Sequence, residues 1–218
     1  MHSGSTKMRK KIALTLTLLT ATFANAEIDQ SGFFVGLDYA NKTSSVEYDS
    51  KGSMPYNTYT SDYSADSLSL KAGYQAYFAR VYARYTDFEH KDTKRDKFTI
   101  SNGKVYELNA DYIPVFYTNE SKDWNIRGLF GVGVGYNASE LTEYEDSLLP
   151  VGESAGPTQN YMQYGFQVGI LVESSYGVSL ETAYRERSGN LQEFTDGANN
   201  AVFSLKTSEF YLGLNYLF

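Results

Sequence analysis

The chain has 218 residues with a formal net charge of −7, no cysteine and 16% aromatic residues. The lack of cysteine excludes disulfide scaffolds, zinc ribbons and thiol nucleophiles, and the acidic balance argues against a nucleic-acid partner, which requires clustered Lys and Arg. Beyond residue 26 no apolar run is long enough for a membrane-spanning helix, which excludes a multi-helix membrane protein, and the many aromatic residues favour strands.

Residues 7–26 have the composition of a secretory signal peptide. A basic head at 7–11 precedes an apolar stretch at 12–19, and Ala24-Asn25-Ala26 forms a small-x-small cleavage motif. The apolar stretch is too short to cross a membrane, which disfavours the alternative of an N-terminal anchor.

We therefore expect cleavage between Ala26 and Glu27. The signal peptide then covers residues 1–26, and the mature chain is a single domain at 27–218. Translation starts at the first methionine or at Met8, and the sequence leaves both open.

Eight segments of the mature chain alternate between apolar or aromatic residues and small, polar or charged residues, as strands with one apolar face do. In chain order they cover 32–39, 67–78, 81–86, 106–116, 124–136, 162–173, 178–185 and 209–218. The connections alternate in length. Long ones are expected at 49–66, 87–103, 141–160 and 186–205, and short ones near 79–80, 119–123 and 174–176. This pattern predicts an antiparallel meander with the termini and short turns at one rim and the long loops at the other.

The volume of the apolar face indicates which face points inward. An eight-stranded barrel encloses little more than its own side chains, so the many Phe, Tyr and Leu residues of that face would not fit inside. The other face carries nine glycines, which suit a crowded lumen: Gly32, Gly36, Gly73, Gly131, Gly133, Gly135, Gly165, Gly169 and Gly213. We therefore predict an all-β, eight-stranded antiparallel up-and-down transmembrane β-barrel, with a secreted lipocalin-like binder as the soluble alternative.

Aromatic residues near the strand ends predict two girdles at the membrane interfaces. The girdle at the long-loop ends would contain Tyr39, Tyr106, Tyr136, Tyr161 and Tyr184, and the girdle at the short-turn rim Tyr74, Tyr112, Phe116, Trp124 and Tyr216. Pro114 conflicts with a continuous strand because it donates no ladder hydrogen bond, and we expect its effect to be small near the short-turn end.

The signal peptide, the eight strands and the last strand FYLGLNYLF together resemble the OmpA and OmpX type of small outer-membrane β-barrel. The resemblance covers essentially all of 27–218, but the peptidoglycan-binding domain of full-length OmpA proteins has no counterpart. It implies a bacterial outer-membrane location and assembly by the barrel-assembly machinery. The C-terminal signal read by that machinery is similar to Phe210, Leu212, Leu214, Tyr216 and Phe218.

The predicted inner face collects bases and acids on neighbouring strands. These are Lys71, Arg84, Glu107, Asp111, Arg127, Glu173, Glu181, Arg185 and Glu209. Unpaired charges would be costly in a narrow lumen, so we expect a network of salt bridges, and the resemblance implies a similar internal network. A structural plug is the favoured interpretation, and a gate or narrow ion path is the alternative.

Other motifs give weak signals for chemistry. His90 is the only histidine of the mature chain and lies in a charged loop, the run GVGVG at 131–135 lacks the Lys and helix of a phosphate loop, and the acidic loop 141–160 lacks a recognised calcium spacing. The bases of the loop 87–104 are candidates for contact with lipopolysaccharide phosphates. We predict no enzyme activity, no cofactor and no metal site.

The sequence therefore predicts a monomeric outer-membrane protein that contributes to envelope structure and surface interaction through four long extracellular loops. Its expected partners are outer-membrane lipid, lipopolysaccharide, the barrel-assembly machinery and an extracellular ligand bound by the loops. The alternatives are a narrow porin-like channel or carrier for small solutes, a lipid-A-modifying enzyme and the soluble binder.

Overall fold

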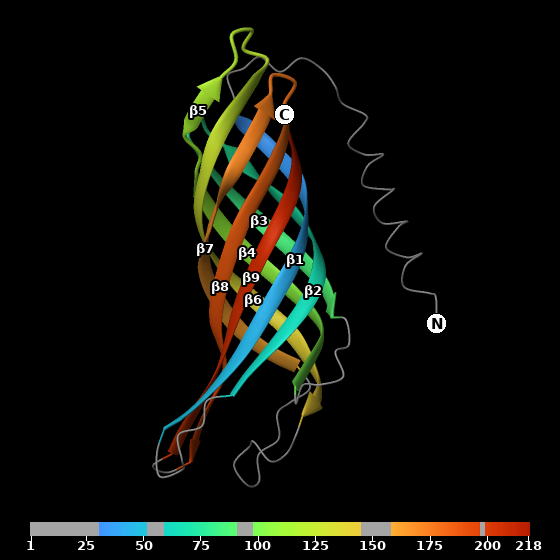
Figure 1. Cartoon of the computed structure of the whole chain (residues 1–218), viewed down its shortest axis with the longest axis vertical. Helices are drawn as coiled ribbons and strands as arrows, with labels where there is room; N and C mark the ends of the chain where they lie inside the picture. The colour runs from blue at the N-terminus through green and yellow to red at the C-terminus, as the bar shows by residue number, and fades with distance from the viewer. Residues whose placement is uncertain (1–30, 52–58, 91–97, 145–157, 197–198) are drawn as a thin grey trace, which may run out of the picture.

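The computed structural model describes residues 31–51, 59–90, 98–144, 158–196 and 199–218, and almost all of them lie in long strands (Figure 1). The predicted signal peptide and its cleavage site at Ala26 and Glu27 lie outside these residues. The strands are β1 (Gly32–Lys51), β2 (Tyr59–Gln75), β3 (Ala79–His90), β4 (Phe98–Tyr112), β5 (Val115–Thr118), β6 (Trp124–Tyr144), β7 (Thr158–Ser174), β8 (Val178–Asp196) and β9 (Asn199–Leu217). Among the described residues, no helix is long and apolar enough to cross a membrane.

The strands form one closed antiparallel sheet. Their order is β4-β3-β2-β1-β9-β8-β7-β6-β5, and β4 also pairs with β6, which closes the sheet into a barrel. Because β4 and β5 pair with the same neighbour, they act as one strand that is interrupted at Ile113 and Pro114. The predicted eight-stranded up-and-down barrel is confirmed.

The strand is interrupted at Pro114, the residue that was expected to conflict with a continuous strand. The register continues across it, from the pair Tyr112 and Phe130 to the pair Val115 and Arg127. The Pro114 carbonyl still accepts a hydrogen bond from the Gly128 amide at 2.9 Å, since proline loses only its donor. The interruption lies at the short-turn end of this strand, and the register shifts between Val115 and Tyr117.

The strands are longer than the alternating segments, so the predicted extent of the long loops is wrong: the loops are shorter than expected. The segment 186–205 was expected to be a loop, but β8 and β9 pair through it up to Asp196 and Asn199. The other three long connections also begin and end with paired strand residues, such as Tyr48 with Tyr59. Alternation missed these extensions because backbone pairing continues after the outward residues have become polar.

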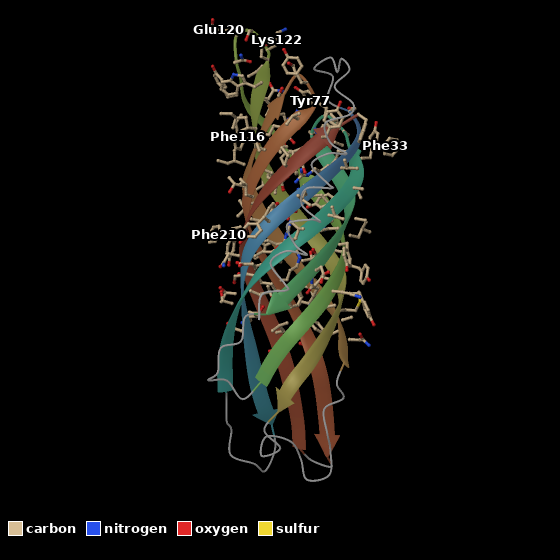
Figure 2. All side chains as sticks on the ribbon, turned by 90° about the vertical axis from the view of Figure 1, so that its right-hand side faces the viewer. Phe33, Tyr77, Phe116, Glu120, Lys122 and Phe210 are labelled. Carbon is tan, nitrogen blue, oxygen red and sulfur yellow. The ribbon has the colours of Figure 1, made fainter. Side chains whose placement is uncertain are left out.

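The two faces of the sheet have the polarity of a membrane barrel. Large apolar side chains point outward, among them Val132, which is 64% exposed, whereas charged side chains such as Asp38 and Arg185 are fully buried inside. Figure 2 shows Phe33, Phe116 and Phe210 pointing away from the barrel. The prediction that the apolar face points outward is confirmed, because a soluble barrel would have the opposite arrangement.

Outward tyrosines divide the barrel into two halves. Tyr39, Tyr106 and Tyr184 are followed toward the long loops by outward polar residues, such as Asn41 after Tyr39 and Glu186 after Tyr184, and Tyr136 is followed by the small Ala138. We call the part with the short turns and the apolar outer band the short-turn half, and the part beyond these tyrosines the long-loop half. The chain ends at the short-turn rim, where β1 also begins, since Gly32 pairs with Gln75 beside a short turn.

Two predicted girdle residues are buried instead. Tyr161 is 4% exposed and shares a hydrogen bond with Asn137 in the lumen, because it is out of phase with the outward Met162. Tyr216 is 6% exposed and packs edge-on against Phe218, with ring centroids 5.0 Å apart. Tyr161 is therefore a correction to the predicted girdles, whereas Tyr216 keeps the outward phase of its cross-strand partner Val35.

Candidate functional site: the charged lumen

Thirteen charged side chains are buried inside the described part of the barrel, seven of them basic and six acidic. The structure places all nine of the predicted charges in this group and adds four: Asp38, Lys42, Arg80 and Arg187. Arg80 was assigned to a turn and Arg187 to a loop, while Lys42 lies beyond the predicted first segment. Of these four charges, only Asp38 could have been assigned to the lumen from the period-2 alternation, because it lies on the same face of the first segment as Gly36.

Glu181 on β8 is the centre of the network in the short-turn half. Its Oε2 accepts hydrogen bonds from Arg80 at 2.8 Å, Lys71 at 3.1 Å and Asn215 at 3.2 Å, and its Oε1 accepts one from the Tyr211 hydroxyl. Lys71 also contacts Asp38 at 2.7 Å. A buried carboxylate with two cations and two neutral donors is fully compensated, as a charge in a low-dielectric interior requires.

Several of these contacts cross the lumen rather than follow neighbouring strands. Arg80 on β3 and Glu181 on β8 are four strands apart in the sheet order, which places them on opposite sides of an eight-stranded barrel. Gln75 on β2 and Glu173 on β7 are also four strands apart, and their side chains meet at 2.6 Å. The side chains therefore span the full width of the lumen and fill it.

A second layer of charges is centred on Arg84, nearer the long-loop half. Arg84 donates to Glu107 at 2.9 Å and to Glu209 at 3.0 Å. Arg185 donates to the same oxygen of Glu209 at 2.5 Å, and Arg187 donates to Glu107 at 2.7 Å. Each carboxylate is shared by two guanidinium groups, whose planar donors suit such bridging.

Gln167 and Asp111 link the two layers. Gln167 donates to Asp111 at 2.5 Å and accepts from Arg185 at 2.7 Å. Asp111 in turn accepts from Arg80 at 2.6 Å, so a continuous chain of contacts connects Arg185 with Glu181. Hydrogen bonds in such a chain strengthen one another, although Arg80 Nη2 and Arg185 Nη2 have no hydrogen-bond partner among the described residues.

At the short-turn end, Arg127 compensates for the interruption of the strand at Pro114. Its guanidinium pairs with Glu173 and donates to the backbone carbonyls of Tyr77 and, at 3.2 Å, of Ile113. Leu129 and Leu171 are fully buried on the same inner face. The arginine thus provides the donor that an irregular, closed strand end requires.

The glycines of the GVGVG run provide space for this network. A Cβ atom at Gly131 would lie 2.0 Å from the Asp111 carboxylate, and one at Gly133 would lie 2.2 Å from the Asn109 side chain. The interpretation of this run as lumen spacing is supported, and its position within strand β6 excludes a phosphate loop.

The long-loop end of the lumen has a different composition. Lys42 lies over the ring of Phe88, with its amine 3.9 Å from the ring centroid, and it forms no ion pair within the described residues. Nearby contacts are between neutral groups, such as Ser44 with Thr207 at 3.3 Å. His90, the weak candidate for catalysis, is the last residue of β3 rather than part of a loop. In the described parts of the chain, no group of histidine and acidic residues has the arrangement of a metal site.

Comparisons with known proteins identify the fold but no family. No known family profile matches the chain, and no curated protein sequence matches it. The crystal structure of Neisserial surface protein A is similar, with a TM-score of 0.53 and 18% identity over 86% of this chain and 99% of that one. Two further outer-membrane proteins are similar at lower scores. One is OprG from Pseudomonas aeruginosa, with a TM-score of 0.47 and 14% identity over 89% of this chain and 99% of that one. The other is the attachment invasion locus protein Ail of Yersinia pestis, with a TM-score of 0.37 and 16% identity over 85% of this chain and 99% of that one.

The similarity to Neisserial surface protein A covers nearly the whole length of that protein. At 18% identity it establishes the architecture and leaves the OmpA and OmpX resemblance at the level of the fold. The chain has the fold of the small eight-stranded outer-membrane β-barrels.

Proposed function

We propose that this protein is an integral outer-membrane β-barrel with a plugged lumen, which acts in envelope structure and in surface interaction through its long-loop half. The plug is carried by one observation: ion pairs such as Arg80 with Glu181 connect opposite walls of the barrel. The apolar outer band and the fold of a known surface protein support the membrane location.

The orientation follows from the different lengths of the connections. Outer-membrane barrels place short turns in the periplasm and long connections outside the cell. In β1, twelve residues follow Tyr39 before the strand ends at Lys51, whereas about 10 residues suffice to cross a bilayer. The long-loop half would therefore extend beyond the membrane and present the four connections to the surroundings.

The absence of cysteine from the sequence allows a direct test of this orientation. Asn160 is exposed in the long-loop half, and Glu120 lies in the short turn between β5 and β6. We expect a membrane-impermeant maleimide to label Asn160→Cys on intact cells and to label Glu120→Cys only after lysis. The reverse pattern would contradict the orientation, and labelling of both sites in the soluble fraction would contradict the membrane location.

Single-channel conductance in planar bilayers tests the plug. The intact protein is expected to show no stable open state, because Arg80, Glu181 and Arg84 fill the cross-section. The Glu181→Ala variant, if folded, should open transiently when its cross-lumen contacts are lost. Stable conductance of the unmodified protein would instead support the narrow porin-like channel.

The last strand is proposed to carry the assembly signal. Phe210, Leu212 and Phe218 point outward with 61–70% of their surface exposed, and the Phe218 amide donates to the Phe33 carbonyl at 2.8 Å. Their outward position leaves them accessible to the assembly machinery before β9 pairs with β1. Deletion of Phe218 should lower outer-membrane levels, whereas Tyr176→Ala at a short turn should not. Unchanged levels of the deletion variant would refute the assembly role.

A further inference from the structure

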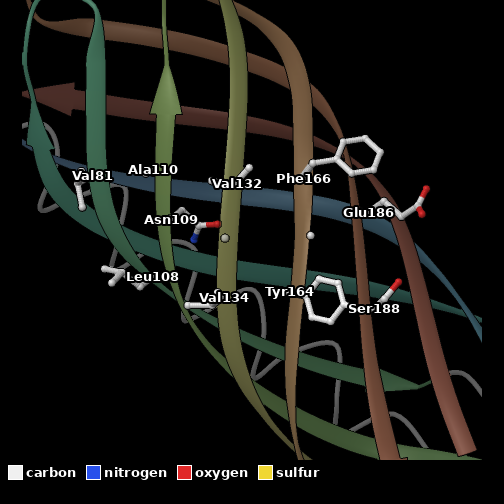
Figure 3. A pocket seen from close by; sticks show the side chains of 12 residues that line it. Val81, Leu108, Asn109, Ala110, Val132, Val134, Tyr164, Phe166, Glu186 and Ser188 are labelled. Carbon is white, nitrogen blue, oxygen red and sulfur yellow. The ribbon is translucent and has the colours of Figure 1, made fainter.

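A long furrow crosses the outer face of the barrel between two rows of side chains (Figure 3). One row runs in register across five strands, from Val81 on β3 through Ala110, Val132 and Phe166 to Glu186 on β8. The neighbouring row ends at Ser188. The furrow has a volume of about 660 Å³ and is lined mainly by apolar atoms, and its polar side chains are Asn109 on β4 and Glu186 and Ser188 on β8.

The two ends of the furrow lie at different depths of the apolar band. Glu186 is two residues beyond Tyr184, at the boundary of the long-loop half, and its cross-strand partner on β9 is Ser208. Val81 is the third residue of β3 and lies near the short-turn rim. The furrow therefore descends diagonally from a polar interface into the apolar band.

We propose that this furrow binds one acyl chain of a lipid from the leaflet at the long-loop end, and that Glu186 selects lipids whose headgroup carries a primary amine. Four strand spacings of about 4.8 Å give a furrow roughly 19 Å long. An acyl chain must descend about 15 Å to reach the middle of the hydrocarbon core, so a tilted chain fits this length. A lipid chain is the occupant that the position within the apolar band dictates.

The selectivity for an amine follows from the negative charge of Glu186 at the β8 end of the furrow. Glu186 is half-buried and accepts a hydrogen bond from the Tyr184 hydroxyl at 3.1 Å, which orients its carboxylate at the boundary. The remaining acceptor positions favour an ammonium group. A headgroup with a primary amine matches this acceptor.

Two variants separate the chain-binding part from the headgroup part. Ala110→Phe places a ring in the furrow, and Ala72→Phe adds the same group to the exposed outer face of β2, outside it. Glu186→Gln keeps the size of the side chain and removes its charge. The heat-dependent shift in gel mobility establishes that each variant is folded, and Val134→Phe replaces Ala110→Phe if the latter does not fold.

The measurement is native mass spectrometry of the purified barrel after incubation with phosphatidylethanolamine or phosphatidylglycerol of equal chain length. We expect one phosphatidylethanolamine to be retained about five to ten times more than phosphatidylglycerol, as one charge-assisted hydrogen bond predicts. Glu186→Gln should abolish this preference, and Ala110→Phe should reduce the retention of both lipids relative to Ala72→Phe.

Two outcomes would overturn the proposal. Equal retention by the Ala110→Phe and Ala72→Phe variants would show that the furrow holds no chain, and an unchanged preference in Glu186→Gln would show that this carboxylate does not select the headgroup. The proposal rests on the membrane location but not on the plug. A barrel that stays soluble without detergent would refute the location itself, whereas conductance data leave the lipid result unaffected.

Discussion

The two halves of this barrel use the same backbone pairing but different side-chain chemistry. In the short-turn half the outer face is apolar and the lumen contains crossing ion pairs around Glu181. In the long-loop half both faces carry polar residues, and Lys42 has a ring rather than a carboxylate as its partner. Hydrogen-bonded backbone pairing is therefore sufficient to extend the strands. The surrounding lipid and the closed lumen determine which residues occupy each face.

The largest effect is expected for removal of the central carboxylate. Glu181→Ala leaves Lys71 and Arg80 buried without their shared partner, and loss of one member of a buried pair costs about 3–5 kcal/mol. The free energy of unfolding in detergent, measured with urea, should fall by this amount. Glu120→Ala, in an exposed turn, is the control and should leave the unfolding midpoint unchanged. A similar midpoint for both variants would show that the network does not stabilise the barrel.

A somewhat smaller effect is expected for a charge on the outer band. Val132→Arg places a cation where lipid is expected, at a cost of about 2–4 kcal/mol near the bilayer centre. Thr43→Arg makes a comparable change on the outer face of the long-loop half and should cost less than about 1 kcal/mol. Unfolding from lipid vesicles measures both values. Equal costs would remove the proposed boundary between the halves.

The difference between the two halves can also be tested by overpacking the lumen. Gly131→Ala would bring a methyl group into the Asp111 and Gln167 side chains, and such overpacking typically costs about 1–3 kcal/mol. Ala138→Ser also adds one heavy atom to β6, but in the long-loop half, and it should change stability by less than about 0.5 kcal/mol. If urea unfolding shows no difference between them, the lumen is less tightly filled than the ion pairs indicate.

The smallest effect is expected for the lysine of the long-loop half. Lys42→Met keeps the aliphatic packing on Phe88 and removes no ion pair formed within the described residues, so we expect only the loss of a buried cation–π contact, about 1–2 kcal/mol. Lys71→Met is the matched variant, and it should cost about 3–5 kcal/mol because Asp38 and Glu181 lose their shared cation. Equal losses in thermal unfolding would mean that both halves of the lumen depend on charge pairing.

Strand alternation predicted the fold well where one face of the sheet contacts lipid. The segment 124–136 was found with the correct phase, because Val132 and Val134 alternate with glycines. The same signal failed for 186–205, where outward residues such as Glu186 and Ser188 are as polar as inward ones. Period-2 patterns therefore detect the apolar band rather than the strand itself.

The candidate site was predictable in composition but not in connectivity. Alternation placed Glu181 and Lys71 on the inner face, yet their contact joins residues of β8 and β2, which are not neighbours in the sheet. Arg80 could not be found because it is adjacent to a short turn, where alternation ends. The outer furrow has no sequence signal, since it depends on the register of five strands at once.

The sequence by itself determined the strand number, the meander order and the direction of the apolar face, because each depends on local alternation and on the limited volume of a small barrel. Only the tertiary structure decided which charges pair across the lumen, how far the strands extend and where the furrow reaches Glu186. These properties depend on the closure and stagger of the whole sheet, which bring together residues that are distant along the chain.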